Sequence, residues 1–417
     1  MGLRISLMAR YEITKSKATE YVKATKKQKG LLLDQICEIT GWCRDNARKQ
    51  LKKAYKNRGK PNIKKNIRRP RKYSFRSRQI LINIWVLSGT SCGQYLVCQI
   101  KDGLIERLTY NKELRDGVKN RGKLVNVNDT AIKEIKQMSS ATIDRYLSNI
   151  KKHLEPLSKA TTKKAQWSLR NEIPFGKSYT SHNTPGWLST DTVAHCGSSL
   201  KGDHIWTLNS TDVVTGWTET ISVKNKASIH IKTGHEEILP RFPFKIQGIN
   251  YDGGSEFINR EMIDYAQLQH YIMTRSRPYH SNDNAHIEQK NGDIVRRYAF
   301  RYRYSGDTAL KILNELWSWV NLKKNYLTPT KKCIGHTKTK SGRTRGIYDK
   351  PKSPARRVLE YDCVKKEVKE EIEKTLNSLN DAYVNRKILD LQDKLLSLAK
   401  DGTLVNLVQE VKSIMAA

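Results

Sequence analysis

Three carboxylate side chains lie in sequence settings from which they could hold divalent metal ions together. Asp191 falls within the β-branched stretch WLSTDTVAH, and Asp252 ends a short apolar run in INYDGGSEFINR. Glu288 lies in SNDNAHIEQKNGDIVRR, a segment with the pattern of a helix. Carboxylate oxygens are hard ligands that suit Mg²⁺ or Mn²⁺. Two such ions, about 4 Å apart, can stabilise both the attacking and the leaving oxygen when a phosphoryl group is transferred.

Two other acids compete for places in such a site. Asp212, in NSTDVVTGW, could replace Asp191 because it also falls on a predicted strand. Glu256 follows Asp252 by about one turn, and we expect it to cap the next helix or to be a polar group on the substrate side. Two glycines lie between these acids, where the missing side chains would leave room for a substrate. Residue type alone leaves the choice between Asp191 and Asp212 open.

The charge of the chain indicates a polyanionic partner, of which nucleic acid is the commonest. Its 417 residues include 77 Lys and Arg against 41 Asp and Glu, a formal net charge of +36. No acid occurs between Asp45 and Asp102, and this stretch contains the run KNRGKPNIKKNIRRPRK. Four basic residues of this run are expected to contact phosphates: Lys64, Lys65, Arg68 and Arg69. A basic protein without a nucleic-acid function would have the same overall charge, so charge alone does not decide.

Two segments near the N-terminus have the periodicity of helix-turn-helix units. In LLLDQICEITGWCRDNARKQLKKAY, an apolar helix is followed by a tight turn at Gly41 and by a basic helix. We expect this second helix to contact DNA through three basic residues: Arg44, Arg48 and Lys49. The segment VNDTAIKEIKQMSSATIDRYLSNIKKH repeats the pattern, with Ser139 as N-cap and Arg145 on the second helix. A plain helical hairpin has the same periodicity, and the basic second helix is what favours DNA binding.

A domain of different character follows a proline-containing linker. From Gly186 onward, five segments rich in β-branched and aromatic residues predict strands, with helices between the later ones. Three antiparallel strands followed by alternating helices and strands predict an α/β domain with a mixed five-stranded sheet. We therefore expect five parts: 1–75 (helix-turn-helix and basic linker), 76–155 (second helix-turn-helix), 156–185 (linker), 186–308 (catalytic core) and 309–417 (helical and basic C-terminal region).

The three acids and their surroundings resemble the DDE integrase and transposase superfamily. The gap between Asp252 and Glu288 is 35 residues, a spacing that is frequent between the second and third acids of that family. YDGGSEF and RPYHSNDNAHIEQKN resemble the surroundings of those two acids, and DTVAH, with TDVVTGW downstream, resembles the first-acid region. The resemblance favours Asp191 over Asp212 as the first acid. It implies a ribonuclease H-like catalytic core, preceded by all-α helix-turn-helix domains and followed by a helical C-terminal region.

The resemblance also implies an activity, the cleavage of DNA strands and their transfer to new sites. Asp191, Asp252 and Glu288 would be the catalytic residues and the ligands of two Mg²⁺ or Mn²⁺ ions. The implied partners are double-stranded DNA, as element ends and as target, and further copies of the chain. KKQKGLLLDQICEITGWCRDNARKQL and SSATIDRYL resemble bacterial insertion-sequence transposases. No histidine precedes His153, so the N-terminal His/Cys zinc site of retroviral integrases is not expected here.

Side chains near the third acid are expected to assist it. Lys290, Arg296 and Arg297 could hold DNA phosphates beside the metal ions, and Asn284 and His286 could orient the substrate. Each of them could equally belong to a solvated helix face.

Two other functions remain open. A catalytically inactive, transposase-derived regulator would bind DNA without cutting it, and three intact acids argue against that. A structure-selective nuclease with the same core would have no need for tandem helix-turn-helix units.

Local features complete the expectations. One long helix is expected over Asn282–Arg303, and a basic loop in HTKTKSGRTRGIYDKPKSPARR. Seven scattered cysteines without a CxxC pair are typical of reduced intracellular thiols. No apolar run is long enough to span a membrane. We therefore expect a cytoplasmic, DNA-associated bacterial protein with no membrane partner.

Overall fold

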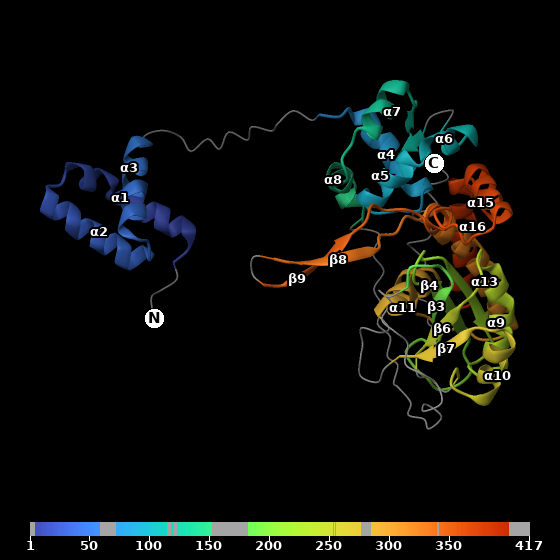
Figure 1. The fold of residues 1–417 in the computed structure, drawn as a ribbon. Helices are drawn as coiled ribbons and strands as arrows, with labels where there is room; N and C mark the ends of the chain where they lie inside the picture. Colours follow the sequence, from blue (N-terminus) through green and yellow to red (C-terminus); the bar gives the residue numbers. More distant parts are fainter. Residues whose placement is uncertain are drawn as a thin grey trace. The chain divides into compact units, whose positions relative to one another are not determined.

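The structure of the chain is a computed structural model. It describes residues 5–58, 72–114, 118–120, 123–151, 182–252, 254, 256–276, 285–339 and 342–399. Within these ranges, no helix is both long enough and apolar enough to cross a membrane. The chain divides into two compact units, Met1–Arg71 and Lys72–Ala417, and each is described by itself. Figure 1 shows the elements of both units in chain order.

Three helices pack around a small core in the first unit. They are α1 (Leu7–Lys23), α2 (Lys26–Thr40) and α3 (Arg44–Lys56). Six buried side chains form their shared core: Tyr21, Leu32, Leu33, Ile36, Ala47 and Leu51. Gly41 ends α2 with a φ of 68°, which lies in the left-handed region that glycine adopts without strain. The chain therefore turns sharply before α3 begins at Arg44.

Helices and a short hairpin form the first part of the second unit. They are α4 (Phe75–Leu87), α5 (Gly93–Lys101), α6 (Leu104–Tyr110), β1 (Val118–Asn120), β2 (Lys123–Val125), α7 (Asp129–Lys136) and α8 (Ser140–Lys151). Ser139 caps α8 as expected. The prediction of an all-α region is wrong, because β1 and β2 pair antiparallel within it. The sequence VKNRGKLV has an asparagine and a glycine between its two valines, a composition that favours a hairpin. The helical pattern of the residues on either side makes this signal hard to recognise in the sequence.

The next part contains the predicted mixed five-stranded sheet. Its strands are β3 (Trp187–Ala194), β4 (Trp206–Asp212), β5 (Thr218–Val223), β6 (Gly248–Tyr251) and β7 (Ile272–Arg275). The order across the sheet is β5-β4-β3-β6-β7, with β3, β4 and β5 antiparallel and β3, β6 and β7 parallel. The α/β class and the strand arrangement are therefore confirmed.

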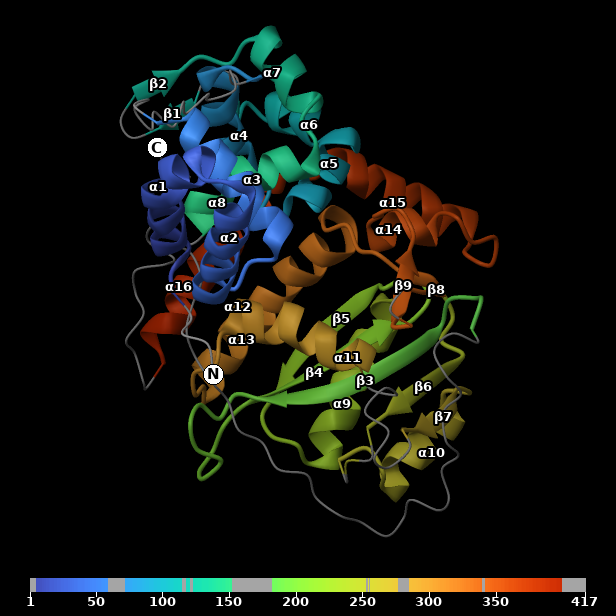
Figure 2. The ribbon, with the colours of Figure 1, turned by 90° about the vertical axis from the view of Figure 1, so that its left-hand side faces the viewer.

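Helices cover both faces of this sheet. The predicted helices α9 (Ser228–Ile238) and α10 (Arg260–Leu268) follow β5 and β6 and pack on one face. The buried side chains at this contact include Leu208, Ile221, Ile231, Ile238, Ile249 and Met262. Figure 2 shows α9 and α10 on one side of the sheet and α11 (Ala285–Lys290) on the other. Residues that follow one another on a strand point to opposite faces, so the polar face of the sheet is the one that α11 covers.

The segment after β7 departs from the single helix expected over Asn282–Arg303. It consists of α11, a π-helical turn η5 (Asn291–Arg296) and α12 (Arg297–Ala299). The segment ends at Phe300, whose φ of 61° does not continue a right-handed helix. A π turn holds one residue more per turn than an α-helix, and such turns are frequent at functional sites.

A row of asparagine side chains closes the free edge of the sheet at β5. The long helix α13 (Asp307–Leu322) and the π turn η6 (Lys323–Leu327) lie along this strand. Their amides hydrogen-bond every second residue of the strand, and the pairs are Asn314 with Ser222, Asn321 with Thr220, and Asn325 with Thr218. These amides satisfy both backbone groups of Thr218 and Ser222 and the carbonyl of Thr220, which an edge strand would leave unpaired, and they fix α13 against the sheet.

The C-terminal part contains a β-hairpin as well as helices. Its elements are β8 (Cys333–Lys338), β9 (Thr344–Tyr348), α14 (Pro354–Val358), α15 (Lys366–Ser378) and α16 (Asp381–Ser397). The expected basic loop is therefore wrong over β8 and β9, which pair antiparallel. Threonine alternates there with basic residues at the period of a strand, whereas the glycines suggest a loop.

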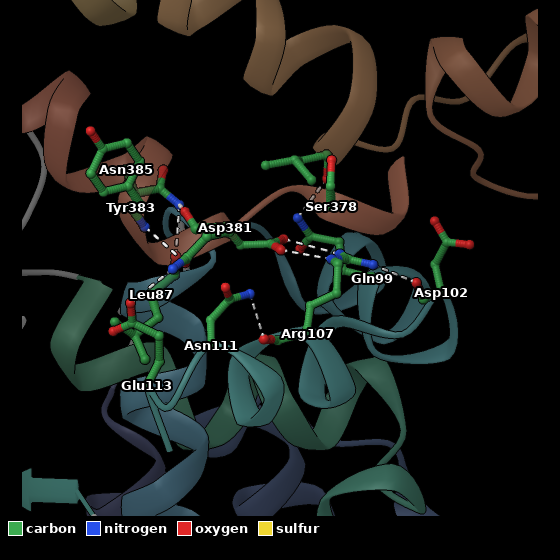
Figure 3. Close-up of polar contacts among 12 residues, drawn as sticks. Leu87, Gln99, Asp102, Arg107, Asn111, Glu113, Ser378, Asp381, Tyr383 and Asn385 are labelled. Carbon is green, nitrogen blue, oxygen red and sulfur yellow. Dashed lines mark hydrogen bonds and ion pairs between the residues drawn. The ribbon is translucent and has the colours of Figure 1, made fainter. Parts of the chain in front are cut away.

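Helix α16 joins the two parts of the second unit. Its apolar face, which includes Ile388, packs against α13. Toward the helical part, Arg107 of α6 forms a bidentate ion pair with Asp381 at 2.8 Å and 3.1 Å (Figure 3). Arg386 makes a second bidentate pair with Glu113, at 2.9 Å and 2.6 Å. Because only 1% of the Asp381 side chain is exposed, the first pair is shielded from water.

Candidate active site

Asp191 and Asp252 lie side by side because of the strand register. Strands β3 and β6 are parallel and pair Thr190 with Tyr251. The next residues along the two chains, Asp191 and Asp252, therefore fall at the same level. Residues at the same level of parallel neighbours point to the same face, and the strands are roughly 5 Å apart. The structure thus brings two of the three predicted carboxylates together.

An asparagine from the covering helix holds the Asp191 carboxylate. Asn291 donates from Nδ2 to Asp191 Oδ2 at 2.7 Å, and the Thr192 N–H donates to Oδ1 at 2.7 Å. Asn291 Oδ1 in turn accepts from Asn209 Nδ2 at 2.8 Å, and Asn209 Oδ1 accepts from Thr220 Oγ1 at 3.1 Å. Because each amide accepts through its oxygen and donates through its nitrogen, these bonds fix the orientation of the Asn209 and Asn291 side chains. Asp191 is therefore presented in one orientation by a relay that begins on β5.

Glu256 is a third carboxylate in this group. The cap expected at this position is wrong, because Asn259 caps α10. Glu256 Oε1 instead accepts a hydrogen bond from Thr192 Oγ1 at 3.2 Å. A Cβ atom added to Gly254 would lie 2.6 Å from Glu256 Oε2 and 2.9 Å from Asp252 Oδ1. Both carboxylates thus converge on Gly254, and a side chain at that position would collide with them.

Glu288 lies on α11, one helical turn before Asn291. Asn291 contacts Asp191, so Glu288 lies within about one turn of a residue that touches the carboxylate group. Buried Ile287 and the contacts of α11 with β3 and β4 hold this helix in place. The Glu288 side chain is exposed. Among the residues that the structure describes, no three His, Cys, Asp or Glu side chains are arranged to hold a metal ion.

The electrostatics of the carboxylates favour a cation between them. Burial and the negative charge of Asp252, with a smaller contribution from Glu256, raise the pKa of Asp191 to about 7. The hydrogen bonds from Thr192 and Asn291 act in the opposite direction. A divalent cation would relieve the repulsion among these groups. The donors are carboxylate oxygens without sulfur, and this set fits Mg²⁺ or Mn²⁺.

Asp212 has a structural role at the other end of the first strand. Its Oδ1 accepts from the Gly186 N–H at 2.9 Å, and its Oδ2 accepts from the N–H and the hydroxyl of Thr215 at 2.6 Å and 2.7 Å. The register pairs it with Leu188, three residues before Asp191. Asp212 is fully buried and closes the turn between β4 and β5. These bonds leave it away from the carboxylate group.

The three predicted phosphate-binding residues after Glu288 have different surroundings. Lys290 is half-buried and donates from Nζ to the Gly216 carbonyl at 3.3 Å, and burial lowers its pKa to about 8. Arg296 donates to the Ala194 carbonyl at the end of β3, at 2.9 Å. Arg297 is exposed and lies 3.6 Å from an Asp293 carboxylate oxygen. Binding of phosphate by these residues stays a prediction. The side chains of Asn284 and His286 lie outside the described residues.

The predicted DNA contacts elsewhere are surface residues. Arg44, Arg48 and Lys49 are exposed on α3, and Arg145 is exposed on α8. Arg44 and Arg48 each lie within 3.4 Å of a carboxylate oxygen on the same unit, which neutralises part of their charge. The remaining predicted contacts lie outside the described residues, and they are Lys64, Lys65, Arg68 and Arg69.

Two residues that hold the site are absent from the sequence predictions. Asn291 follows Glu288 by three residues, and this helical spacing is the signal that could have found it. Asn209 lies directly opposite Asp191 on β4. A buried asparagine among β-branched residues signals a satisfied polar contact, but not its partner.

Comparison with known proteins gives one clear relative. No known protein-family model matches the chain. The chain is 30% identical over 337 residues to "Uncharacterized protein y4rM" of Sinorhizobium fredii (strain NBRC 101917 / NGR234). The alignment covers 79% of this chain and 89% of that protein.

Solved structures with some similarity are integrases. The HTLV-2 integrase catalytic core domain in complex with magnesium is 16% identical, with a TM-score of 0.27, and the match covers 38% of this chain and 93% of that one. The BIV integrase catalytic core domain is 11% identical, with a TM-score of 0.26, over 34% and 83%. A chain of the simian T-cell lymphotropic virus intasome, solved with PP2A regulatory subunit B56 gamma, is 14% identical, with a TM-score of 0.29, over 50% and 68%. Scores this low support no argument about this chain.

Proposed function

The chain belongs to the family of protein y4rM of Sinorhizobium fredii, and we propose that it is a DNA transposase or integrase of the DDE type. It would bind the ends of an element and catalyse metal-dependent strand cleavage and strand transfer. The observation that carries the proposal is the strand register, which sets Asp191 beside Asp252 on the face covered by the Glu288 helix. The spacing between Asp252 and Glu288 in the sequence and the residues around these two acids support the proposal.

Asp191, Asp252 and Glu288 would hold two Mg²⁺ or Mn²⁺ ions. Ions bound there would activate the attacking oxygen and stabilise the leaving oxygen of the phosphate. Asn291 keeps the Asp191 carboxylate oriented toward the site through its 2.7 Å bond. Gly254 has no side chain, so the carboxylates of Asp252 and Glu256 can lie close together beside it. Glu288, exposed on α11, would complete the site once DNA is bound.

DNA recognition is assigned to the helical parts. In 1–75, α2 and α3 would form a helix-turn-helix unit, with Arg44, Arg48 and Lys49 on its basic helix. In 76–155, α7 and α8 would form a second one that uses Arg145. The excess of basic residues over the whole chain supports a DNA partner. Two element ends must be joined in one reaction, which favours a homo-oligomer on DNA.

A second candidate is a transposase-derived regulator that binds DNA without cutting it. The exposed position of Glu288 favours this alternative, as does the lack of a three-carboxylate metal group in the described part of the chain. Both candidates share the DNA-binding surfaces and differ only in whether metal-dependent chemistry occurs.

A cleavage and joining assay separates the two. The purified chain would be mixed with labelled duplexes taken from the DNA that flanks its gene, and with a supercoiled plasmid as target. We expect nicked ends and joined products with Mg²⁺ or Mn²⁺ and none with EDTA, because the carboxylates need the cations. A chain that retains the duplexes on a gel but yields no product with either metal would be the regulator.

A further inference from the structure

The hairpin of β8 and β9 is an exposed element without a core of its own. Most of its described residues are exposed. Its large apolar side chains are exposed as well: Ile334 is 64% exposed, Ile347 45% and Tyr348 58%. An isolated two-stranded hairpin is only marginally stable in water. An element of this kind is retained most easily when a partner covers it.

The charge of the hairpin indicates what that partner is. No acid occurs from Lys331 to Tyr348, whereas seven residues of this stretch can carry positive charge: Lys331, Lys332, His336, Lys338, Lys340, Arg343 and Arg345. Protein interfaces are depleted in lysine at their core, whereas surfaces that bind nucleic acid are rich in lysine and arginine. The missing acids therefore favour a polyanion over a second protein surface.

The register places cations on both faces of the ribbon. Thr337 pairs with Arg345, and Lys338 pairs with Thr344. Because neighbouring residues on a strand point to opposite faces, Arg345 and Lys338 lie on different faces. Gly335 leaves part of the ribbon without a side chain, with nothing within 4 Å of the position that a Cβ atom would take, which lets another backbone approach closely. A groove of DNA has a line of phosphates along each wall, and a ribbon charged on both faces fits between them.

The base of the ribbon is fixed to the second unit. Arg357 of α14 forms a bidentate ion pair with Asp349, at 2.5 Å and 3.2 Å, and donates to the Thr330 carbonyl at 2.8 Å. Thr330 and Lys352 also exchange two backbone hydrogen bonds, at 2.9 Å and 3.1 Å. These contacts hold the base of the ribbon, while Lys338, Thr339 and Arg343 farther along it are exposed.

The same base lies next to the helix that carries Glu288. Lys290, two residues after Glu288, donates to the Gly216 carbonyl. A Cβ atom added to Gly216 would lie 3.7 Å from the Thr330 hydroxyl and 3.8 Å from Lys290 Nζ. The base of the ribbon is therefore in contact with the segment that carries Glu288.

We propose that the β8–β9 ribbon is a DNA-binding arm that enters the major groove of the duplex presented to the acidic site. The proposal rests on the proposed function for the identity of its ligand. The major groove is about 12 Å wide and admits a two-stranded ribbon. Lys338, Arg343 and Arg345 contact the phosphates along the groove walls, and Tyr348 lies nearer the fixed base.

Salt-dependent binding tests the arm directly. The triple variant Lys338→Ala, Arg343→Ala, Arg345→Ala is compared with the triple variant Lys365→Ala, Lys366→Ala, Lys374→Ala, which removes three exposed lysines at and near α15. Binding to a duplex is measured in EDTA over a series of salt concentrations. The ribbon variant is expected to bind roughly tenfold more weakly at low salt, with a log K against log salt slope smaller by about 2 to 3. The matched control variant is expected to change the slope by less than about 1. Equal slopes for wild type and ribbon variant overturn the proposal.

A crosslinking experiment distinguishes DNA from a second copy of the chain as the partner of the ribbon. A photoreactive amino acid replaces Thr344, which is exposed and uncharged. Crosslinks to the duplex support the arm, whereas crosslinks to a second copy of the chain, or none, overturn it. The two proposals fail separately: a chain that shows the ribbon-dependent slope but never nicks DNA keeps the arm and loses the catalytic assignment. A wild-type chain that does not bind duplex DNA overturns both.

Discussion

Asp252→Asn is expected to reduce metal-dependent strand cleavage by a factor of roughly 10³ or more, a loss of about 4 kcal/mol of transition-state stabilisation. The amide is nearly isosteric with the carboxylate, but it is neutral and a much weaker ligand for Mg²⁺. The backbone of the site is expected to persist, because the Gly254 N–H can still donate to the remaining oxygen of residue 252. The measurement is the initial rate of nicking of a labelled duplex with Mg²⁺.

Asp264→Asn is the matched control for this experiment. Asp264 lies on α10, is 56% exposed and pairs with exposed Arg260. The same chemical change there is expected to leave the nicking rate unchanged, since exposed ion pairs contribute little. Binding of duplex DNA in EDTA is expected to be the same in all three proteins. A nicking rate in Asp252→Asn within a few-fold of wild type would remove Asp252 from the catalytic group.

Arg107→Leu is expected to lower the free energy of unfolding of the second unit by about 3 to 5 kcal/mol. The substitution leaves the Asp381 carboxylate buried without its bidentate partner, and only 1% of that side chain is exposed. The start of α16 lies at Asp381, so the helix dipole offsets part of the cost. Chemical denaturation followed by tryptophan fluorescence measures the loss.

Two further variants show whether the unpaired charge is the cause. In the second ion pair, 39% of the Arg386 side chain is exposed, so Arg386→Leu is expected to cost only about 1 kcal/mol. Combining Arg107→Leu with Asp381→Asn removes the buried charge and is expected to recover part of the stability. If Arg107→Leu cost no more than Arg386→Leu, the shielded pair would not be what holds the helical part to α16.

The nearness of Asp191 and Asp252 on neighbouring strands could be predicted from the sequence, whereas the catalytic role of these two acids and of Glu288 stays a prediction. Asp191 and Asp252 are set by strand periodicity and by the position where an apolar run ends, and the register of β3 and β6 then places them together. The relay through Asn209 and Asn291 could not be predicted in this way. Its two asparagines are 82 residues apart, and only the folded sheet and its covering helix bring them into contact.

Glu256 shows the limit of reasoning from spacing alone. One turn after Asp252, it suggests a helix cap, but Asn259 takes that role and the Glu256 carboxylate turns toward Thr192. Which of two nearby polar groups caps a helix depends on backbone angles that the sequence does not fix. The β8–β9 ribbon was not predicted for a related reason. Its glycines favour a loop, whereas the pairing of its strands depends on the contact of Arg357 with Asp349 at its base.

The way in which α16 joins the two parts of the second unit also depends on long-range contacts. Its helical periodicity is visible in the sequence, but its partner on α6 is 274 residues away along the chain. The sequence shows that Arg107 is a base and that Asp381 is an acid, but it does not show that the two side chains are in contact. Cohesion within the second unit is therefore a property of the folded chain, and helix-by-helix prediction does not reveal it.

Anomalous diffraction from crystals grown with Mn²⁺ and a DNA duplex would show whether Asp191, Asp252 and Glu288 hold metal ions. We expect Mn²⁺ peaks at about 2.0 to 2.2 Å from carboxylate oxygens of Asp191 and Asp252, with Glu288 turned inward as a further ligand. A peak held by Asp191, Asp252 and Glu256 while Glu288 stays in solvent would contradict the assignment of the third acid. The absence of any Mn²⁺ peak at Asp191 and Asp252 would contradict the claim that this carboxylate group is a catalytic metal site.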